Sequence, residues 1–134
     1  MIAALLLLQV RCQFALIAEN GALGAGTPFW VAARFRPQPG WHVYWQNPGD
    51  SGLPTVLEWE LPAGYKVTET RWPAPAVFES SGIITFGYDR EFSVLARISP
   101  PADERGGGII ALRARADWMA CKEACETGSS KSTL

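Results

Sequence analysis

The chain has 134 residues, which is the usual size of one domain. Its 12 Lys and Arg residues nearly balance its 13 Asp and Glu residues, and this balance argues against a protein that binds nucleic acid through a basic surface. Because 48% of the residues are apolar, the chain can bury a sizeable core and is not expected to be disordered. Its three cysteines are too few for a small domain held together mainly by disulfides.

The N-terminal segment, residues 1–8, is apolar and resembles a shortened secretory signal. It lacks the basic residues that open such a signal, and it is far shorter than the roughly 20 residues of a membrane-spanning helix. We therefore expect residues 1–8 to be a signal-like segment of an exported protein. Residues 9–134 are expected to form a single domain.

Apolar and polar side chains alternate along most of the remaining chain, with the period of two that is typical of half-buried strands. We expect strands over residues 10–16, 29–35, 42–45, 56–60, 65–70, 91–98 and 110–121. Clusters rich in Gly, Pro and Asn separate these runs and predict turns. The pattern predicts an all-β fold, an antiparallel sandwich of about seven or more strands.

In the last of these runs, Trp118 belongs to the apolar face and Cys121 to the opposite, polar face. Cys121 is therefore expected on the solvated side, at the end of a strand. Residues 116–126 are also rich in helix formers. A helix would place Cys121 and Cys125 on one face with parallel Cβ directions, which suit a disulfide poorly. We favour a strand followed by a loop.

Cys121 and Cys125 form a Cys-x3-Cys pair that is open to three interpretations. A dithiol that exchanges with other disulfides needs an accessible thiolate and a nearby second thiol, and a short spacer in a loop permits both. A structural disulfide is compatible with the same spacing, although so short a loop constrains little of the unfolded chain. A zinc site is disfavoured, because zinc takes four ligands and the chain has only three cysteines and one histidine in all.

The rest of the sequence contains few candidates for catalytic or ligand-binding residues. Cys12 belongs to the apolar face of its expected strand, and we expect it to be a small, buried, apolar side chain. Trp41, Tyr44 and Trp45 are expected to be core and sheet-edge residues. There is no nucleophile motif and no phosphate-binding glycine motif, and the carboxylates are scattered without an evident acid/base pair. The single histidine, His42, is expected to be a sheet-edge residue rather than a catalytic one. The sequence therefore indicates no cofactor and no metal.

Four segments become recognisable together: residues 39–54 (PGWHVYWQNPGDSGLP), 72–75 (WPAP), 86–88 (FGY) and 118–125 (WMACKEAC). In this order they resemble the N-terminal periplasmic domain of the DsbD/ScsB thiol:disulfide interchange proteins, with the ScsB branch the more similar. The long first segment is specific, whereas the spacing of the last segment alone is a weak signal. The resemblance covers nearly the whole chain from about Cys12 onward.

This resemblance implies an immunoglobulin-like β-sandwich with one redox-active pair, Cys121 and Cys125, as the catalytic residues. It implies a periplasmic domain of a protein-disulfide reductase, which receives reducing equivalents from the membrane-embedded and thioredoxin-like domains of the full-length protein. The implied partners are periplasmic thioredoxin-like or isomerase-like proteins, including those of cytochrome c maturation, which react through a mixed disulfide. Cys125 would attack first. The alternative is an immunoglobulin-like protein-binding module whose Cys121–Cys125 disulfide is only structural.

The resemblance carries three further expectations. A loop with an aromatic residue shields the cysteines in the family, and residues 78–88 are the candidate stretch here. The membrane and thioredoxin-like domains would attach the protein to the inner membrane, and they are missing from this chain. The domain itself is expected to be cut short at its C-terminal end.

Overall fold

The computed structural model describes residues 10–18, 26–102 and 110–134. It contains ten strands in this order: β1 (Cys12–Ala18), β2 (Phe29–Pro37), β3 (His42–Gly49), β4 (Val56–Glu60), β5 (Lys66–Arg71), β6 (Ala76–Ser80), β7 (Ile83–Tyr88), β8 (Phe92–Ser99), β9 (Arg113–Cys121) and β10 (Cys125–Thr133). The predicted all-β fold is confirmed. The signal-like segment predicted for residues 1–8 lies outside the described residues. In the described ranges, no helix has the length and apolar character needed to cross a bilayer.

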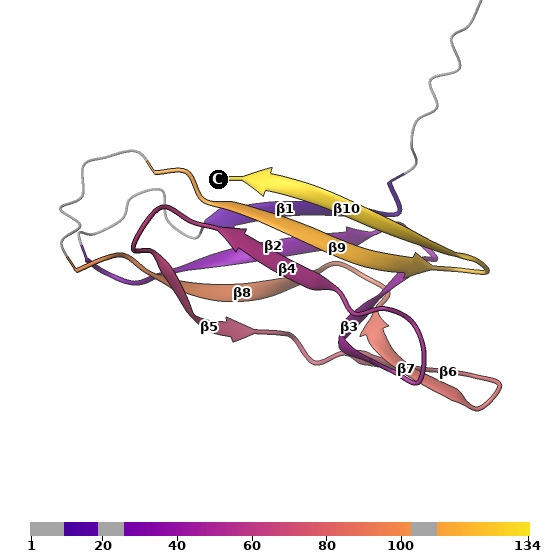
Figure 1. Ribbon diagram of the computed structural model, residues 1–134. Helices are drawn as coiled ribbons and strands as arrows, with labels where there is room; N and C mark the ends of the chain where they lie inside the picture. Colours follow the sequence, from indigo (N-terminus) through magenta and orange to yellow (C-terminus); the bar gives the residue numbers. More distant parts are fainter. Residues whose placement is uncertain (1–9, 19–25, 103–109) are drawn as a thin grey trace, which may run out of the picture.

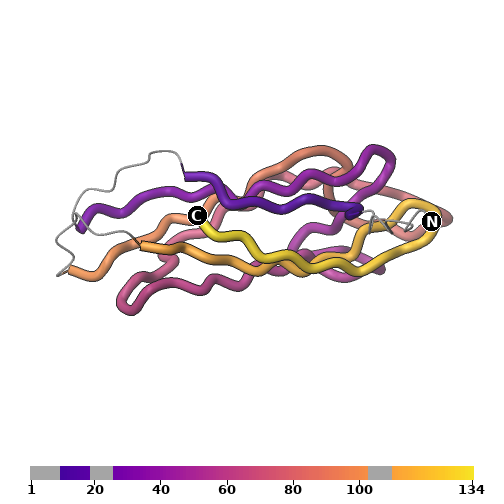
Figure 2. The backbone as a smooth tube through the Cα atoms, turned by 90° about the horizontal axis from the view of Figure 1, so that it is seen from above, coloured from indigo at the N-terminus to yellow at the C-terminus, as the bar shows by residue number. Residues whose placement is uncertain are grey.

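The strands form two antiparallel sheets that make an immunoglobulin-like sandwich (Figure 1). The first sheet has the order β1-β2-β8-β5, and the second has the order β10-β9-β3-β7-β6, with β4 also paired to β9. Seen from above, the domain is elongated, and β1 lies beside β10 (Figure 2). The Leu16 amide donates a hydrogen bond to Ser132 Oγ at 3.0 Å and so joins the two sheet edges.

The core lies between the two sheets and is filled by alternating side chains from both. Phe35 of β2 is at its centre, because it stacks on Phe92 at 4.9 Å and meets the edge of Trp118 at 6.4 Å. Trp118 therefore fixes β9, and with it the hairpin that follows, against the first sheet. The other large side chains that are fully buried in this core are those of Cys12, Val31, Val43, Val94 and Ile98.

Three strands, β6, β7 and β10, were not expected from the sequence. A loop does follow Cys121, as predicted, but it is only a three-residue turn, and the nine-residue strand β10 then begins at Cys125. Most side chains of β10 are exposed, and the strand is held by its residue-by-residue pairing with β9. An edge strand that is stabilised in this way needs no apolar alternation, so its sequence resembles that of a loop.

Candidate functional site

Both cysteines lie at the tip of the β9–β10 hairpin. Cys121 ends β9, Cys125 begins β10, and the Lys122 amide donates to the Ala124 carbonyl at 3.0 Å within the turn. The two cysteines are cross-strand partners with Cα atoms 4.1 Å apart, and a disulfide joins them. The strand interpretation of this segment is confirmed and the helix alternative is wrong.

The two halves of the disulfide differ in exposure. Cys121 is only 3% exposed, whereas Cys125 is exposed. The prediction that Cys121 emerges on the solvated side is therefore wrong. The alternation along β9 does place Cys121 on the face of the sheet opposite Trp118. At the end of β9, however, Tyr44 covers that face, and the Tyr44 hydroxyl donates a hydrogen bond to Cys121 Sγ at 3.4 Å. Cys125 is the half of the disulfide that an incoming protein can reach.

Tyr44 is held in place from two sides. Its ring lies against Gly52, where an added Cβ would come within 2.5 Å of the ring carbons, so no larger residue fits there. Its carbonyl accepts a hydrogen bond from Thr55 Oγ1 at 2.6 Å. Burial raises the pKa of Tyr44, so its hydroxyl keeps the proton that it donates to sulfur. Tyr44 is buried, as the sequence predicts, but its contact with Cys121 was not foreseen.

An aromatic cluster continues from Tyr44 across the same face of the second sheet. His42 is the cross-strand neighbour of Cys121, and its ring meets Tyr44 at 5.3 Å and Phe78 at 4.9 Å. Burial lowers the pKa of His42, and the charge of Asp89 opposes this shift in part. The neutral imidazole is therefore favoured at neutral pH.

Residues 78–88, expected as a shielding loop, instead form most of the hairpin of β6 and β7. Phe78 of this hairpin packs on His42, and the ring that contacts Cys121 is that of Tyr44 from β3. The aromatic cover of the buried sulfur is thus part of the sheet itself.

Charged side chains tie the hairpin tip to the rest of the domain. Arg11 forms an ion pair with Glu126 at 3.2 Å, and its guanidinium lies 4.5 Å from the centre of the Trp41 ring. Lys122 lies over Gly40, where an added Cβ would be 3.3 Å from its Nζ. Arg11 thereby offsets the negative charge of Glu126, the residue that follows Cys125.

Cys12 is set apart from this site by its environment. It is fully buried, as the sequence predicts, and burial raises its pKa to about 12. A thiol with this pKa holds almost no thiolate at neutral pH and is a poor nucleophile. Among the described residues, no three His, Cys, Asp or Glu side chains gather in a way that could hold a metal ion.

The comparisons with known proteins agree with this architecture. The family model of the N-terminal part of the thiol:disulfide interchange protein DsbD matches residues 8–134. The N-terminal periplasmic domain of ScsB from Proteus mirabilis has a TM-score of 0.62 and 21% identity, over 92% of this chain and 44% of that one. The N-terminal domain of Neisseria meningitidis DsbD in the reduced form has a TM-score of 0.52 and 14% identity, over 90% of this chain and 82% of that one.

This chain thus spans less than half of the ScsB chain that it matches. A search of curated protein sequences gave no match. At such low identities the two solved structures show the fold alone, whereas the family match extends over nearly the whole chain. The chain therefore belongs to the family of N-terminal domains of the thiol:disulfide interchange protein DsbD.

Proposed function

We propose that this chain is a periplasmic module that passes reducing equivalents to partner proteins through Cys121 and Cys125. One observation carries the proposal: the cysteine pair is asymmetric. The sulfur of Cys121 is buried and accepts a hydrogen bond from Tyr44, whereas Cys125 is exposed at the hairpin tip. A dithiol carrier needs one cysteine that meets the partner and another that waits beside it, and this pair offers both.

The exchange has two steps. In the reduced module, the Cys125 thiolate attacks one sulfur of the partner's disulfide, and the partner's other sulfur leaves as a thiolate. The Cys121 thiolate then attacks Cys125 Sγ, forms the Cys121–Cys125 disulfide and releases the partner's remaining thiolate. Two electrons pass to the partner, and its two thiolates take up protons.

Tyr44 stabilises the thiolate of Cys121 both when the module reduces its partner and when the module is itself reduced. Its hydroxyl donates to Cys121 Sγ at 3.4 Å, and such a bond stabilises the thiolate form of Cys121. A stabilised thiolate is available to resolve the mixed disulfide. When an upstream dithiol attacks Cys125 to reduce the module again, the same bond makes Cys121 a better leaving group.

The cellular setting of the proposal is taken from the resemblance to the DsbD/ScsB proteins, and the family match supports it. The reducing equivalents come from a membrane-embedded domain and a thioredoxin-like domain, which attach the module to the inner membrane in the full-length protein. The recipients are thioredoxin-like or isomerase-like proteins of the periplasm. The module is then one domain of a protein-disulfide reductase, and residues 9–134 constitute that domain.

The burial of Cys121 also favours a second candidate, in which the disulfide is only structural and the domain binds other proteins. A buried sulfur resists attack, and a disulfide at a hairpin tip fixes the ends of two strands. The two candidates differ in whether the pair reacts while the domain stays folded.

Trapping experiments test the roles of the two cysteines. We expect reduced Cys121→Ala to form a lasting mixed disulfide with a thioredoxin-fold isomerase that keeps only its attacking cysteine, activated as a mixed disulfide with thionitrobenzoate. Cys125 displaces the thionitrobenzoate, and neither protein then has a second accessible thiol that could resolve the product. Cys125→Ala should form such a product about tenfold more slowly or worse, since Cys121 is covered. Non-reducing electrophoresis and mass spectrometry measure the adduct. Equal trapping by both variants would overturn the assignment, and no trapping by either would favour the structural disulfide.

A further inference from the structure

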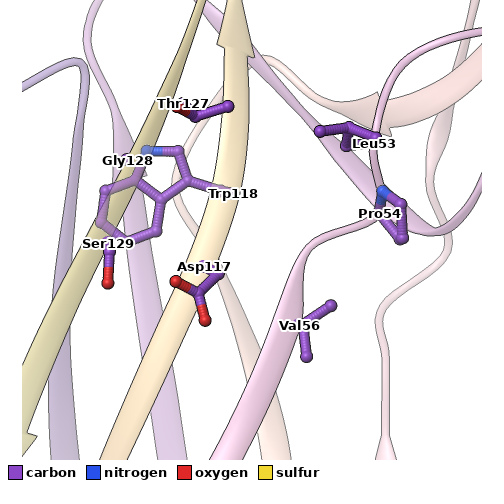
Figure 3. A pocket seen from close by; sticks show the side chains of 8 residues that line it. All are labelled: Leu53, Pro54, Val56, Asp117, Trp118, Thr127, Gly128 and Ser129. Carbon is purple, nitrogen blue, oxygen red and sulfur yellow. The ribbon is translucent and has the colours of Figure 1, made fainter.

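A groove with a volume of about 480 Å³ lies over the β9–β10 hairpin, between β10 and the chain around β4. In Figure 3, Leu53, Pro54 and Val56, from the β3–β4 connection and β4, form one side. Thr127 and Ser129 of β10 form the other side, and the Trp118 indole lies between these two residues. Leu53 is 49% exposed and Val56 is 41% exposed, so the groove presents two large apolar side chains to solvent.

The strand register places this groove on the same face of the second sheet as the disulfide. Asp117 of β9 pairs with Val56 on one side and with Ser129 on the other. Side chains of one strand alternate between faces, so Asp117 shares its face with Cys121, and Ser129 and Thr127 share theirs with Cys125. At about 3.3 Å per residue, the groove extends from about 7 Å to about 13 Å beyond the cysteines.

Tyr44 connects the groove to the cysteines. Its hydroxyl contacts Cys121, and its ring rests on Gly52, the residue before Leu53. The same side chain thus covers the buried sulfur and borders the start of the groove. A protein that reaches Cys125 over this face meets the groove next.

The geometry of a mixed disulfide fixes what lies over the groove. The Cα of the partner's cysteine must come within about 4.4–6.8 Å of the Cα of Cys125. In an extended segment, residues about two to four positions from that cysteine then lie about 7–13 Å further along. This is the span of Thr127, Ser129 and Val56, so a partner segment that runs along the hairpin in this direction places its side chains in the groove.

We propose that this groove binds the extended segment that flanks the partner's reactive cysteine, and that it prefers an aliphatic side chain in that segment. The preference follows from the apolar side chains of Leu53, Pro54 and Val56. An acidic side chain is disfavoured, because it would meet the carboxylate of Asp117, which lines the groove. The neighbouring cation, Arg115, already pairs with Asp117 at 3.1 Å and is not free to bind a second carboxylate. The inference rests on the proposed exchange at Cys125 and adds which partners that exchange selects.

The test compares symmetric disulfides of short peptides with oxidised glutathione, which is too short to reach the groove. The peptides carry Leu, Ser or Asp at both the second and the fourth residue from their cysteine, because in an extended segment these side chains share the face of the cysteine. We expect the reduced 134-residue chain to react about tenfold faster with the Leu peptide than with the Ser peptide, and most slowly with the Asp peptide. Leu53→Ser and Val56→Ser should each remove most of this preference and leave the rate with oxidised glutathione unchanged. Val77→Ser, at a 65% exposed residue of β6, is the control and should keep the preference.

Two results would overturn the proposal that the groove binds the partner's segment, even though the chain still exchanges with oxidised glutathione. One is equal rates with the Leu and Ser peptides in the unmodified chain. The other is a loss of preference in Val77→Ser as large as in Val56→Ser. A change of self-association in Val56→Ser, seen by sedimentation, with unchanged peptide rates would assign the groove to a second copy of the chain and would equally overturn the proposal.

Failure of the exchange itself has a different signature, because even oxidised glutathione would then not react. The groove is still testable in that case with a Leu peptide whose cysteine is replaced by serine. We expect this peptide to shift the nuclear magnetic resonance signal of the Trp118 indole N–H, and to shift it less in Val56→Ser. No shift in the unmodified chain would overturn the groove.

Discussion

At the level of single residues, Tyr44 determines how the two sulfurs differ. Without its ring, Cys121 would stand on the outer face of β9, as strand parity predicts. With it, Cys121 is buried and its sulfur accepts a hydrogen bond. Gly52 and Thr55 hold Tyr44 in this position, so a loop outside the hairpin sets the chemistry of the hairpin.

We predict that Tyr44→Phe slows the reduction of the Cys121–Cys125 disulfide by dithiothreitol about tenfold, because hydrogen bonds to charged groups contribute about 1.5–3 kcal/mol. The Cys121 thiolate that leaves in this reaction loses its donor, and its pKa rises. The rate is measured by the appearance of free thiols under native conditions.

Tyr88→Phe is the matched control for this substitution. It also removes a hydroxyl from a buried tyrosine of the second sheet, but that hydroxyl donates to the Pro73 carbonyl at 2.8 Å. We expect Tyr88→Phe to leave the reduction rate unchanged even where it lowers stability. Equal slowing in both variants would show that the effect of Tyr44 is not local to sulfur.

At the level of elements, the β9–β10 hairpin depends on a close approach between its two strands. Gly128 of β10 faces Trp118 of β9, and an added Cβ would come within 2.5 Å of the indole Nε1. Trp118 cannot withdraw, because Phe35 packs against its other side. Gly128 is thus the position at which β10 can pass over the buried indole.

We predict that Gly128→Val lowers the free energy of unfolding by about 1–3 kcal/mol through this overlap. Ser129→Val introduces the same side chain at the next residue, which is exposed, and should change the free energy by less than about 0.5 kcal/mol. Urea denaturation followed by tryptophan fluorescence measures both. A Gly128→Val variant as stable as Ser129→Val would mean that the indole can move aside.

The sequence predicted those elements whose stability comes from a buried face. The alternation along β2, β8 and β9 identifies them because one side of each faces the core. β6 and the edge strand β10 carry mostly exposed side chains, so no alternation marks them. In β7 the exposed Ile83 and Ile84 and the buried Thr85 break the apolar alternation. The pairing of Cys121 with Cys125 was open to prediction because it is local. The cover over Cys121 was not, because Tyr44 lies 77 positions away and is brought there by the pairing of β3 with β9.

At the level of the whole molecule, the core and the disulfide lie in different places. The core fills the space between the sheets, around Phe35, Trp118 and the fully buried side chains of β2 and β8. The disulfide closes a ring of only a few residues at the hairpin tip, with a sequence separation of 4. A sandwich arranged in this way can change the oxidation state of its cysteines without rebuilding its core.

We therefore predict that reduction of the Cys121–Cys125 disulfide leaves the domain folded and lowers the free energy of unfolding by no more than about 2 kcal/mol, the loop-closure entropy of so short a ring. Urea denaturation of the oxidised and reduced forms measures the difference, and near-ultraviolet circular dichroism of the tryptophans checks the fold.

The number of thiols that react under native conditions distinguishes a redox-active disulfide from a purely structural one. Cys12 serves as the internal reference, because it is fully buried and its pKa is raised to about 12. Under several millimolar dithiothreitol at neutral pH, the folded chain should expose the two thiols of Cys121 and Cys125 while Cys12 stays unreactive. If all three thiols react together, and only at urea concentrations that unfold the domain, the disulfide opens by global unfolding. It is then part of the scaffold, and the interchange proposal fails with it.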